Sequence, residues 1–196
     1  IAEADLREGR PQRAPRPEAR SEIVNDMSIQ VATVNGSGSQ SSNTVLLRAI
    51  FQMGVPVSGK NLFPSNIAGL PTWYTVRASA RGYVARKKEV DVLVAMNPAA
   101  LRTNLKDLPP RGILVVDMDA FTDRNLKKAG YQTNPLEDGS LAKWQLVHFN
   151  ISQLTLDAVK PFGLGNKEAL RCKNMWTLGL ALWMFDRERQ PLIDWL

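Results

Sequence analysis

The chain has very little of what metal and redox sites require. Its 196 residues contain one cysteine, Cys172, and one histidine, His148. A single cysteine excludes an internal disulfide and a four-thiolate zinc or iron–sulfur site built from this chain alone. A single histidine excludes a metal site or proton relay that needs two imidazoles. No catalytic constellation is visible, so we expect neither a catalytic residue nor a bound metal in this chain.

Long apolar runs are lacking as well. The longest is "MWTLGLALWMF", residues 175–185, which falls well short of the roughly 20 residues that a membrane-spanning helix needs. The N-terminus shows no signal-peptide pattern, and we therefore expect a cytoplasmic protein with no membrane partner. The first residue is Ile1 rather than Met, which leaves open whether the chain is a free subunit or a domain of a longer one.

Negative charge is missing from a long central stretch. Between Asp26 and Glu89 every charged residue is positive, and the net charge of the chain is +6. A basic balance of this kind favours anionic partners such as nucleotides. The hydrophobic fraction of 44% is ordinary for a globular protein, and the length fits one α/β domain.

Residues 1–27 have almost nothing to bury. The stretch "REGRPQRAPRPEARSE" interleaves five arginines with three prolines, which predicts an extended arm. A solvated linker and an arm that docks on a partner subunit both fit this pattern. Aromatic residues that could stack on bases do not interleave with the arginines, so we do not expect nucleic-acid binding. The folded domain is predicted to span 28–196.

Apolar runs alternate with helical patterns through this domain. The predicted strands are 29–34, a strand near 57, 72–79, 82–86 (paired with 72–79), 91–97, 112–119 and 144–150. The predicted helices are 44–54, capped by Ser41, Ser42 or Asn43, then 99–108, 123–130, 152–163 and 166–188. This order predicts an α/β fold: a three-layer, mostly parallel, Rossmann-like sheet with helices on both faces. Ligands of such sheets bind at the carboxyl ends of the strands.

A glycine- and serine-rich loop, "NGSGSQSSN", follows the first predicted strand. Gly36 and Gly38 match the first two glycines of G-x-G-x-x-G, and Ser41 stands at the third. Glycine lets a phosphate approach the backbone, and the N-terminus of the following helix offers free N–H groups. No Gly-Lys-Ser/Thr follows, so the loop is not a Walker A motif. The candidate anion cradle comprises Gly36, Ser37, Gly38, Ser39, Gln40, Ser41, Ser42 and Asn43; a tight turn without ligand also fits.

The missing carboxylates bear on which phosphate the loop would hold. A unit that binds NAD needs an Asp or Glu about 20 residues beyond the glycines, for the ribose 2′-hydroxyl. No acid stands there. The charged residues that follow the loop are cations, and such a site suits NADP or coenzyme A. Lys60 and Arg77 adjoin predicted strands and are the candidate phosphate contacts, although a solvated basic face also accounts for such cations.

Other polar residues have simpler interpretations. Asp117 and Asp119 end the strand "GILVVDMD", and we expect them to act as caps rather than as a metal pair. His148 is predicted to be a core histidine. Cys172 is predicted to pack within the last long helix.

The stretch "VNGSGSQSSNTVLLRAIFQMGVPVSGKNLFPSNIAGLPTWYTVRAS", followed by "DVLVAMNP" and "GILVVD", resembles the γ-type domain of 2-oxoacid:ferredoxin oxidoreductases. It is most similar to the N-terminal part of the α subunit of 2-oxoglutarate:ferredoxin oxidoreductase. The resemblance covers roughly 28–196. Many γ domains carry Gly-x-Gly-Gly-Gln-Gly in the loop, and residues 36–41 keep the first two glycines and the glutamine.

The resemblance implies a division of labour. Such enzymes decarboxylate a 2-oxoacid on thiamine diphosphate, pass electrons through iron–sulfur clusters to ferredoxin and release an acyl-CoA, here succinyl-CoA. The γ domain is associated with coenzyme A. Thiamine diphosphate, Mg²⁺ and the 4Fe–4S cluster would then lie on other domains or subunits, which would also receive ferredoxin, and this chain alone would be inactive. The alternatives are an NADP- or other nucleotide-binding module of a different oxidoreductase, and a structural subunit.

Overall fold

A computed structural model describes residues 25–34, 37, 39–62, 70–185, 187 and 189–194. Nearly all of the predicted arm, 1–24, lies outside the described residues, as do Gly36 and Gly38. No helix within the described ranges is long and apolar enough to cross a membrane.

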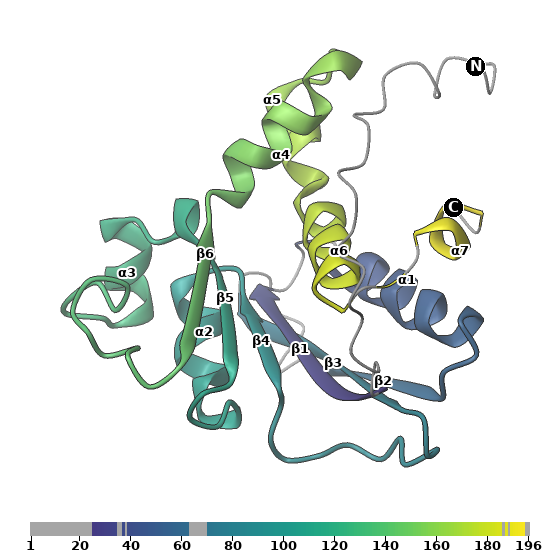
Figure 1. Ribbon diagram of the computed structural model, residues 1–196. Helices are drawn as coiled ribbons and strands as arrows, with labels where there is room; N and C mark the ends of the chain where they lie inside the picture. The colour runs from purple at the N-terminus through teal and green to yellow at the C-terminus, as the bar shows by residue number, and fades with distance from the viewer. Residues whose placement is uncertain are drawn as a thin grey trace, which may run out of the picture.

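The described residues build one six-stranded sheet with the order β2-β3-β1-β4-β5-β6 (Figure 1). The strands are β1 Asp26–Val34, β2 Val57–Leu62, β3 Pro71–Ser79, β4 Val92–Ala95, β5 Ile113–Asp117 and β6 Gln145–Phe149. Strands β1, β4, β5 and β6 are parallel neighbours, whereas β3 runs antiparallel to both β1 and β2. The prediction of a mostly parallel α/β sheet is confirmed.

Seven α-helices and three short 3₁₀ segments are described. The helices are α1 Ser39–Gln52, α2 Pro98–Asn104, α3 Asp123–Ala129, α4 Ile151–Val159, α5 Asn166–Arg171, α6 Lys173–Met184 and α7 Gln190–Ile193. The 3₁₀ segments are η1 Leu105–Asp107, η2 Met118–Ala120 and η3 Lys160–Phe162. Local signals explain several ends: Asn97 caps α2 through Ala100 N–H, and Gly130 ends α3 in the left-handed conformation.

Alternate side chains of each strand enter two separate cores. Val92 and Val94 of β4 face the α1–α6 side, whereas Leu93 and Ala95 face the α2–α3 side. This two-sided burial explains the continuous apolar run at 92–95, because a strand covered on both faces has no solvent side. Figure 1 shows α1 and α6 on one face of the sheet and α2 and α3 on the other. The predicted three layers are confirmed.

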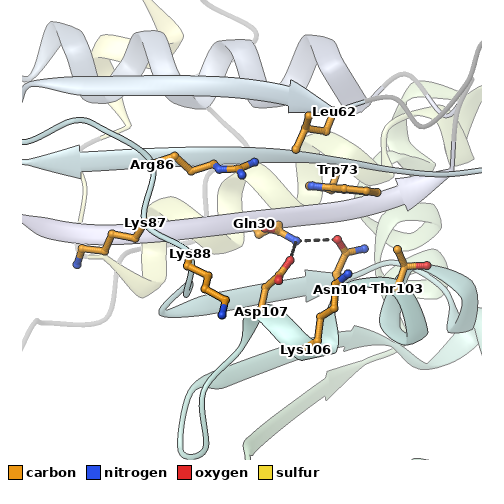
Figure 2. Close-up of a pocket in the computed structure, with 10 residues that line it drawn as sticks. All are labelled: Gln30, Leu62, Trp73, Arg86, Lys87, Lys88, Thr103, Asn104, Lys106 and Asp107. Atoms are coloured by element: carbon orange, nitrogen blue, oxygen red, sulfur yellow. Dashed lines mark hydrogen bonds between the residues drawn. The ribbon is translucent and has the colours of Figure 1, made fainter.

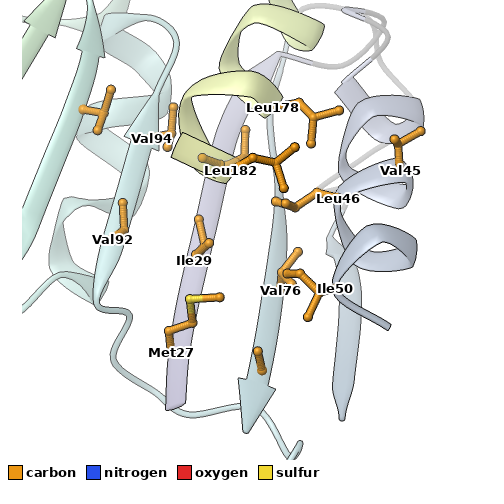
Figure 3. Packing of buried hydrophobic residues seen from close by; sticks show 14 of the residues in the cluster. Met27, Ile29, Val45, Leu46, Ile50, Val76, Val92, Val94, Leu178 and Leu182 are labelled. Atoms are coloured by element: carbon orange, nitrogen blue, oxygen red, sulfur yellow. The ribbon is translucent and has the colours of Figure 1, made fainter. Parts of the chain in front are cut away.

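The core on the α1 face joins the sheet to α1 and α6. Ile50 of α1 and Leu182 of α6 are each 1% exposed and share one cluster with Ile29 of β1; Figure 3 shows Ile50 beside Val76 of β3. Full burial of each such side chain is worth about 1.5–3 kcal/mol. Helix α1 also approaches β2 closely, since a Cβ on Gly59 would lie 2.4 Å from Leu47 Cδ1.

Three predicted details are wrong. Helix α1 begins at Ser39, so Ser41, Ser42 and Asn43 lie inside its first turns rather than capping it. Residues 82–86 form no strand; this segment belongs to an irregular crossover from β3 to β4, and Ser58 of β2 donates a hydrogen bond to the Val84 carbonyl. The predicted helix 166–188 is two helices, α5 and α6, separated at Cys172.

Candidate functional site

The glycine loop lies at the carboxyl end of β1, where the sheet topology predicts a ligand. Between β1 and α1, Ser37 is the described residue of the loop. Its N–H donates to the Val34 carbonyl at 3.2 Å, and its hydroxyl accepts from the Thr33 hydroxyl at 3.1 Å. These two bonds turn the chain back at the end of the strand. The cradle residues Gly36 and Gly38 lie outside the described residues.

The first turns of α1 divide the remaining cradle residues into two groups. Gln40 and Ser41 are exposed, whereas Ser39, Ser42 and Asn43 are buried. The Ser42 hydroxyl donates to the Ser39 carbonyl at 2.9 Å, so its proton is not directed at the loop. The first turn contains no acidic residue, which leaves the positive end of the helix dipole uncompensated by a carboxylate of its own.

Asn174, at the start of α6, fixes the loop from the side. Its Nδ2 donates to the Ser37 carbonyl at 2.8 Å. Beside it lies a cavity of about 10 Å³ that Asn43 and Asn174 line together, which is room for about one water molecule. Asn43 Nδ2 is buried and has no hydrogen-bond partner among the described residues, so it has an unused donor at this point.

The neighbouring residue, Lys173, anchors the same helix to the sheet. Its Nζ lies 2.6 Å from Oδ2 of Asp117 at the end of β5 and 3.1 Å from the Ser152 hydroxyl. Asp117 is 0% exposed, and its other oxygen accepts the Ile151 N–H at 3.2 Å. A buried carboxylate therefore orients two helix starts, and through α6 it holds the donor that contacts Ser37.

The expectation that Asp117 and Asp119 act as caps is confirmed. The Asp119 carboxylate accepts from Gln153 N–H at 3.1 Å and from Asn150 Nδ2 at 2.9 Å, so both acids bind the first turn of α4. Within the described ranges, no group of three or more His, Cys, Asp or Glu residues could hold a metal ion.

The two predicted phosphate contacts do not lie at the loop. Lys60, on the edge strand β2, pairs with Thr75 of β3, level with Gln30 of β1. This is four residues, or about 13 Å, short of Val34. Because Gly59 faces α1, Lys60 faces the opposite side of the sheet. The sequence placed it beside a strand but could not give its register.

Arg77 is further away and already has partners. It lies opposite Ser28, six residues or about 20 Å from the carboxyl end of β1. Its guanidinium pairs with Asp26 and donates to the carbonyls of Met27 and Ala78 at 3.1 and 2.6 Å. The hydrogen bond from Arg77 holds the pKa of Asp26 below its usual range. Arg77 is a buried structural residue, and we leave it out of the site.

The two single-copy residues also differ from their predictions. His148 is exposed on the edge strand β6 rather than in the core. Cys172 is half-buried in the junction between α5 and α6.

Sequence reasoning missed Asn174 and Lys173. They follow one another at a helix start, far along the chain from the loop, and such a pair gives no signal without knowledge of the strand order. It also missed a cavity on the α2 face of the sheet. The lining of this cavity includes Arg86, Lys87, Lys88 and Lys106.

The comparisons with known proteins place this chain in a family. The family model of pyruvate ferredoxin/flavodoxin oxidoreductase matches residues 28–196. The 2-oxoglutarate oxidoreductase subunit KorA of Mycobacterium tuberculosis is 52% identical over 98 residues, which are 50% of this chain and 15% of that protein. The α subunit of 2-oxoacid:ferredoxin oxidoreductase 2 of Aeropyrum pernix is 28% identical over 47% of this chain and 14% of its own length. The matches thus span a small part of both relatives.

Solved structures support the same fold. The 2-oxoglutarate:ferredoxin oxidoreductase of Magnetococcus marinus, with 2-oxoglutarate, coenzyme A and succinyl-CoA bound, matches with a TM-score of 0.67 and 26% identity over 87% of this chain and 26% of that one. The γ subunit of a keto/oxoacid ferredoxin oxidoreductase from Geobacter sulfurreducens matches in fold, with a TM-score of 0.60 and 17% identity over 85% of this chain and 82% of that one. On the strength of the family match over 28–196, the chain belongs to the pyruvate ferredoxin/flavodoxin oxidoreductase family.

Proposed function

We propose that this chain is the coenzyme A-handling domain or subunit of a 2-oxoacid:ferredoxin oxidoreductase, with 2-oxoglutarate as the oxoacid and succinyl-CoA and CO₂ as products. The observation that carries the proposal is the loop at the end of β1, which leads into a helix with no acid in its first turn. The similarity to a structure that holds coenzyme A and succinyl-CoA supports it.

The proposed contacts come from the loop and the first turn of α1. Backbone N–H groups at the start of the helix and the exposed side chains of Gln40 and Ser41 would donate to the diphosphate. Gly36 and Gly38 would let it approach, and Ser37 would be held in place by Asn174. The nearest buried carboxylate, Asp117, is paired with Lys173 and adds little repulsion.

The contribution of this chain to the reaction would be positional. Holding the nucleotide end of coenzyme A fixes where its thiol can reach, and such positioning replaces the entropy cost of a chance encounter. With one cysteine in the chain, the 4Fe–4S cluster would be supplied by another domain or subunit. Thiamine diphosphate with Mg²⁺ and the ferredoxin contact would lie there too.

A charge placed on the first turn of α1 tests the loop. We expect Ser41→Asp to leave the fold intact, because an acid there favours the helix dipole, yet to weaken coenzyme A binding by repelling its phosphates. A like charge at close range in partly screened surroundings costs on the order of 1–2 kcal/mol, or roughly tenfold in Kd. Calorimetric titration of coenzyme A into the purified complex measures it.

Ser41→Asn is the matched control, since it changes size alike without adding charge. We expect it to bind coenzyme A within about twofold of the wild type. Equal affinities for the Asp and Asn variants would remove the loop from the site. Tighter binding of NADP than of coenzyme A by the wild type would instead favour a nucleotide-binding module of a different oxidoreductase.

A further inference from the structure

A hollow of about 510 Å³ opens on the sheet face opposite α1 (Figure 2). We call it the basic pocket, and its lining includes Leu62, Trp73, Arg86, Lys87, Lys88 and Lys106. Its volume lies within the roughly 300–1,000 Å³ of small-molecule sites. Helix α1 covers the other face of the sheet, and the lining contains no described residue of the loop or of α1, so this pocket is separate from the site described above.

Strand register explains why a hollow exists here. Leu62, Trp73 and Ala32 lie level with one another on β2, β3 and β1, and Ala32 belongs to the α2-side core. Helix α2 contacts β1, β3 and β4, and among its residues Thr103 and Asn104 at its end line the hollow. The crossover from β3 to β4 returns over the same face, bonded at Val84 by Ser58. It thereby holds Arg86, Lys87 and Lys88 at the rim.

The cations of the rim are available for a ligand. Lys87 Nζ lies 3.6 Å from the Asp26 carboxylate. Arg86, Lys88 and Lys106 have no ion pair with any residue that the structure describes. Three such like charges around one hollow repel each other, and a polyanion in the hollow would relieve that repulsion.

The floor of the pocket is polar but already satisfied. Gln30 is 3% exposed and donates to Asn104 Oδ1 at 2.7 Å, and its own oxygen accepts from Thr75 at 3.2 Å. Asn104 donates to the Ala100 carbonyl at 2.9 Å. The side-chain amides of Gln30 and Asn104 are hydrogen-bonded to each other and to neighbouring groups. They are therefore not available to form specific hydrogen bonds with a ligand. Recognition is left to the cations and to the half-buried indole ring of Trp73.

A ring beside a group of cations suits one chemical class. We propose that the basic pocket binds a nucleotide, with the base against Trp73 and the phosphates at Arg86, Lys88 and Lys106. Stacking on an aromatic face tolerates different bases, and Arg contacts phosphate with a planar pair of donors. Asp107, the one carboxylate of the lining, is suited to a ribose hydroxyl and keeps the phosphates toward the rim.

Two sources supply this chemistry: a free nucleotide, and the 3′-phosphorylated ADP half of coenzyme A. A free nucleotide in the pocket is compatible with coenzyme A at the loop. Coenzyme A in the pocket would instead place its diphosphate at the rim cations and would replace the loop assignment. Titrating ADP and 3′,5′-ADP separately into the purified complex, with inorganic phosphate and adenosine alongside, tests it. We expect a nucleotide to bind at least about tenfold more tightly than either fragment, because ring and phosphates contribute together.

Variants of matched charge locate the binding. We expect Arg86→Gln with Lys88→Gln to weaken nucleotide binding about tenfold or more. The control is Lys127→Gln with Lys128→Gln, which removes the same charge from an exposed part of α3 and is expected to bind within about twofold. We expect Trp73→Leu to weaken the nucleotide but not inorganic phosphate, and Trp73→Phe, which keeps a ring, to stay close to wild type.

Each outcome of these titrations either supports or overturns nucleotide binding in the basic pocket. If the pocket variants lose affinity for 3′,5′-ADP and coenzyme A competes with it, the proposal holds with coenzyme A as the source. If they lose affinity for ADP and coenzyme A does not compete, the proposal holds with a free nucleotide as the source. Phosphate binding as tightly as nucleotide, or equal affinities for the pocket and control variants, overturns it. Ser41→Asp is expected to leave ADP binding unchanged, so failure here and failure of the loop proposal remain distinguishable.

Discussion

Replacing Lys173 by Met should destabilise the protein far more than a surface lysine would. The substitution keeps the length of the side chain but leaves the Asp117 carboxylate, 0% exposed, with the Ile151 N–H as its remaining described donor. Breaking a buried ion pair from one side costs about 3–5 kcal/mol. Because the Lys173 side chain is 23% exposed and water reaches its ammonium, we expect the low end, about 3 kcal/mol. For a chain of this size that corresponds to a Tm lower by roughly 6–12 °C.

Chemical denaturation followed by tryptophan fluorescence gives the free energy of unfolding. Lys167→Met, at an exposed lysine of α5, is the control and should change that free energy by about 0.5 kcal/mol or less. The double variant Asp117→Asn with Lys173→Met removes both charges and should recover about 2 kcal/mol of the loss. A cost below about 1 kcal/mol for Lys173→Met, or no recovery in the double variant, would refute the view that a buried charge pair holds α6 to β5.

Two further predictions concern the sheet. Because Arg77 lowers the pKa of Asp26 from its ordinary 3.8, the ionised carboxylate stabilises the folded state above that value and the effect fades as the pH falls toward the lowered pKa. The Tm difference between the wild type and Asp26→Asn should therefore be full near pH 7 and shrink below pH 3.8; a difference independent of pH would contradict this. Gly59→Ala should cost about 1–3 kcal/mol, measured by denaturation, because the new Cβ would meet Leu47 and Tyr74 at 2.4 and 2.5 Å. Lys60→Ala, at an exposed position of the same strand facing away from α1, is the control, and equal stability of Gly59→Ala and wild type would show that α1 can move away from β2.

The fold was largely predictable from sequence because its signals are local. The continuous apolar runs at 92–95 and 113–117 and the glycine that ends α3 identify their elements without any knowledge of neighbours. The errors arise where the outcome depends on contacts. Residues 82–86 look like a strand, yet the backbone turns at Gly82, with a φ of 78°, and the segment crosses over the sheet instead of pairing with β3.

The site was predictable only in part, because its geometry depends on register. The glycine loop could be placed after the first strand. Arg77 was expected near it because it adjoins a predicted strand, but it lies at the opposite end of β1. The ion-pair partner of Arg77 is Asp26. This acid marks the start of the stretch without negative charge that favoured an anionic ligand. Asn174 contacts Ser37 across 137 positions of sequence, and no periodicity reports such a contact.

Helix α6 is attached to the sheet through Lys173 and Asp117 and to the loop through Asn174 and Ser37. These two attachments limit where the chain can be cut into fragments. A fragment cut after β6 would keep every strand of the sheet, yet it would lack the ammonium that neutralises Asp117 and the amide that holds Ser37. It would also expose the faces of β1 and β4 that Leu178 and Leu182 cover. The helices after β6 are therefore an integral part of the unit, and a segment chosen for expression should keep α7 as well, because Leu192 packs against the same core.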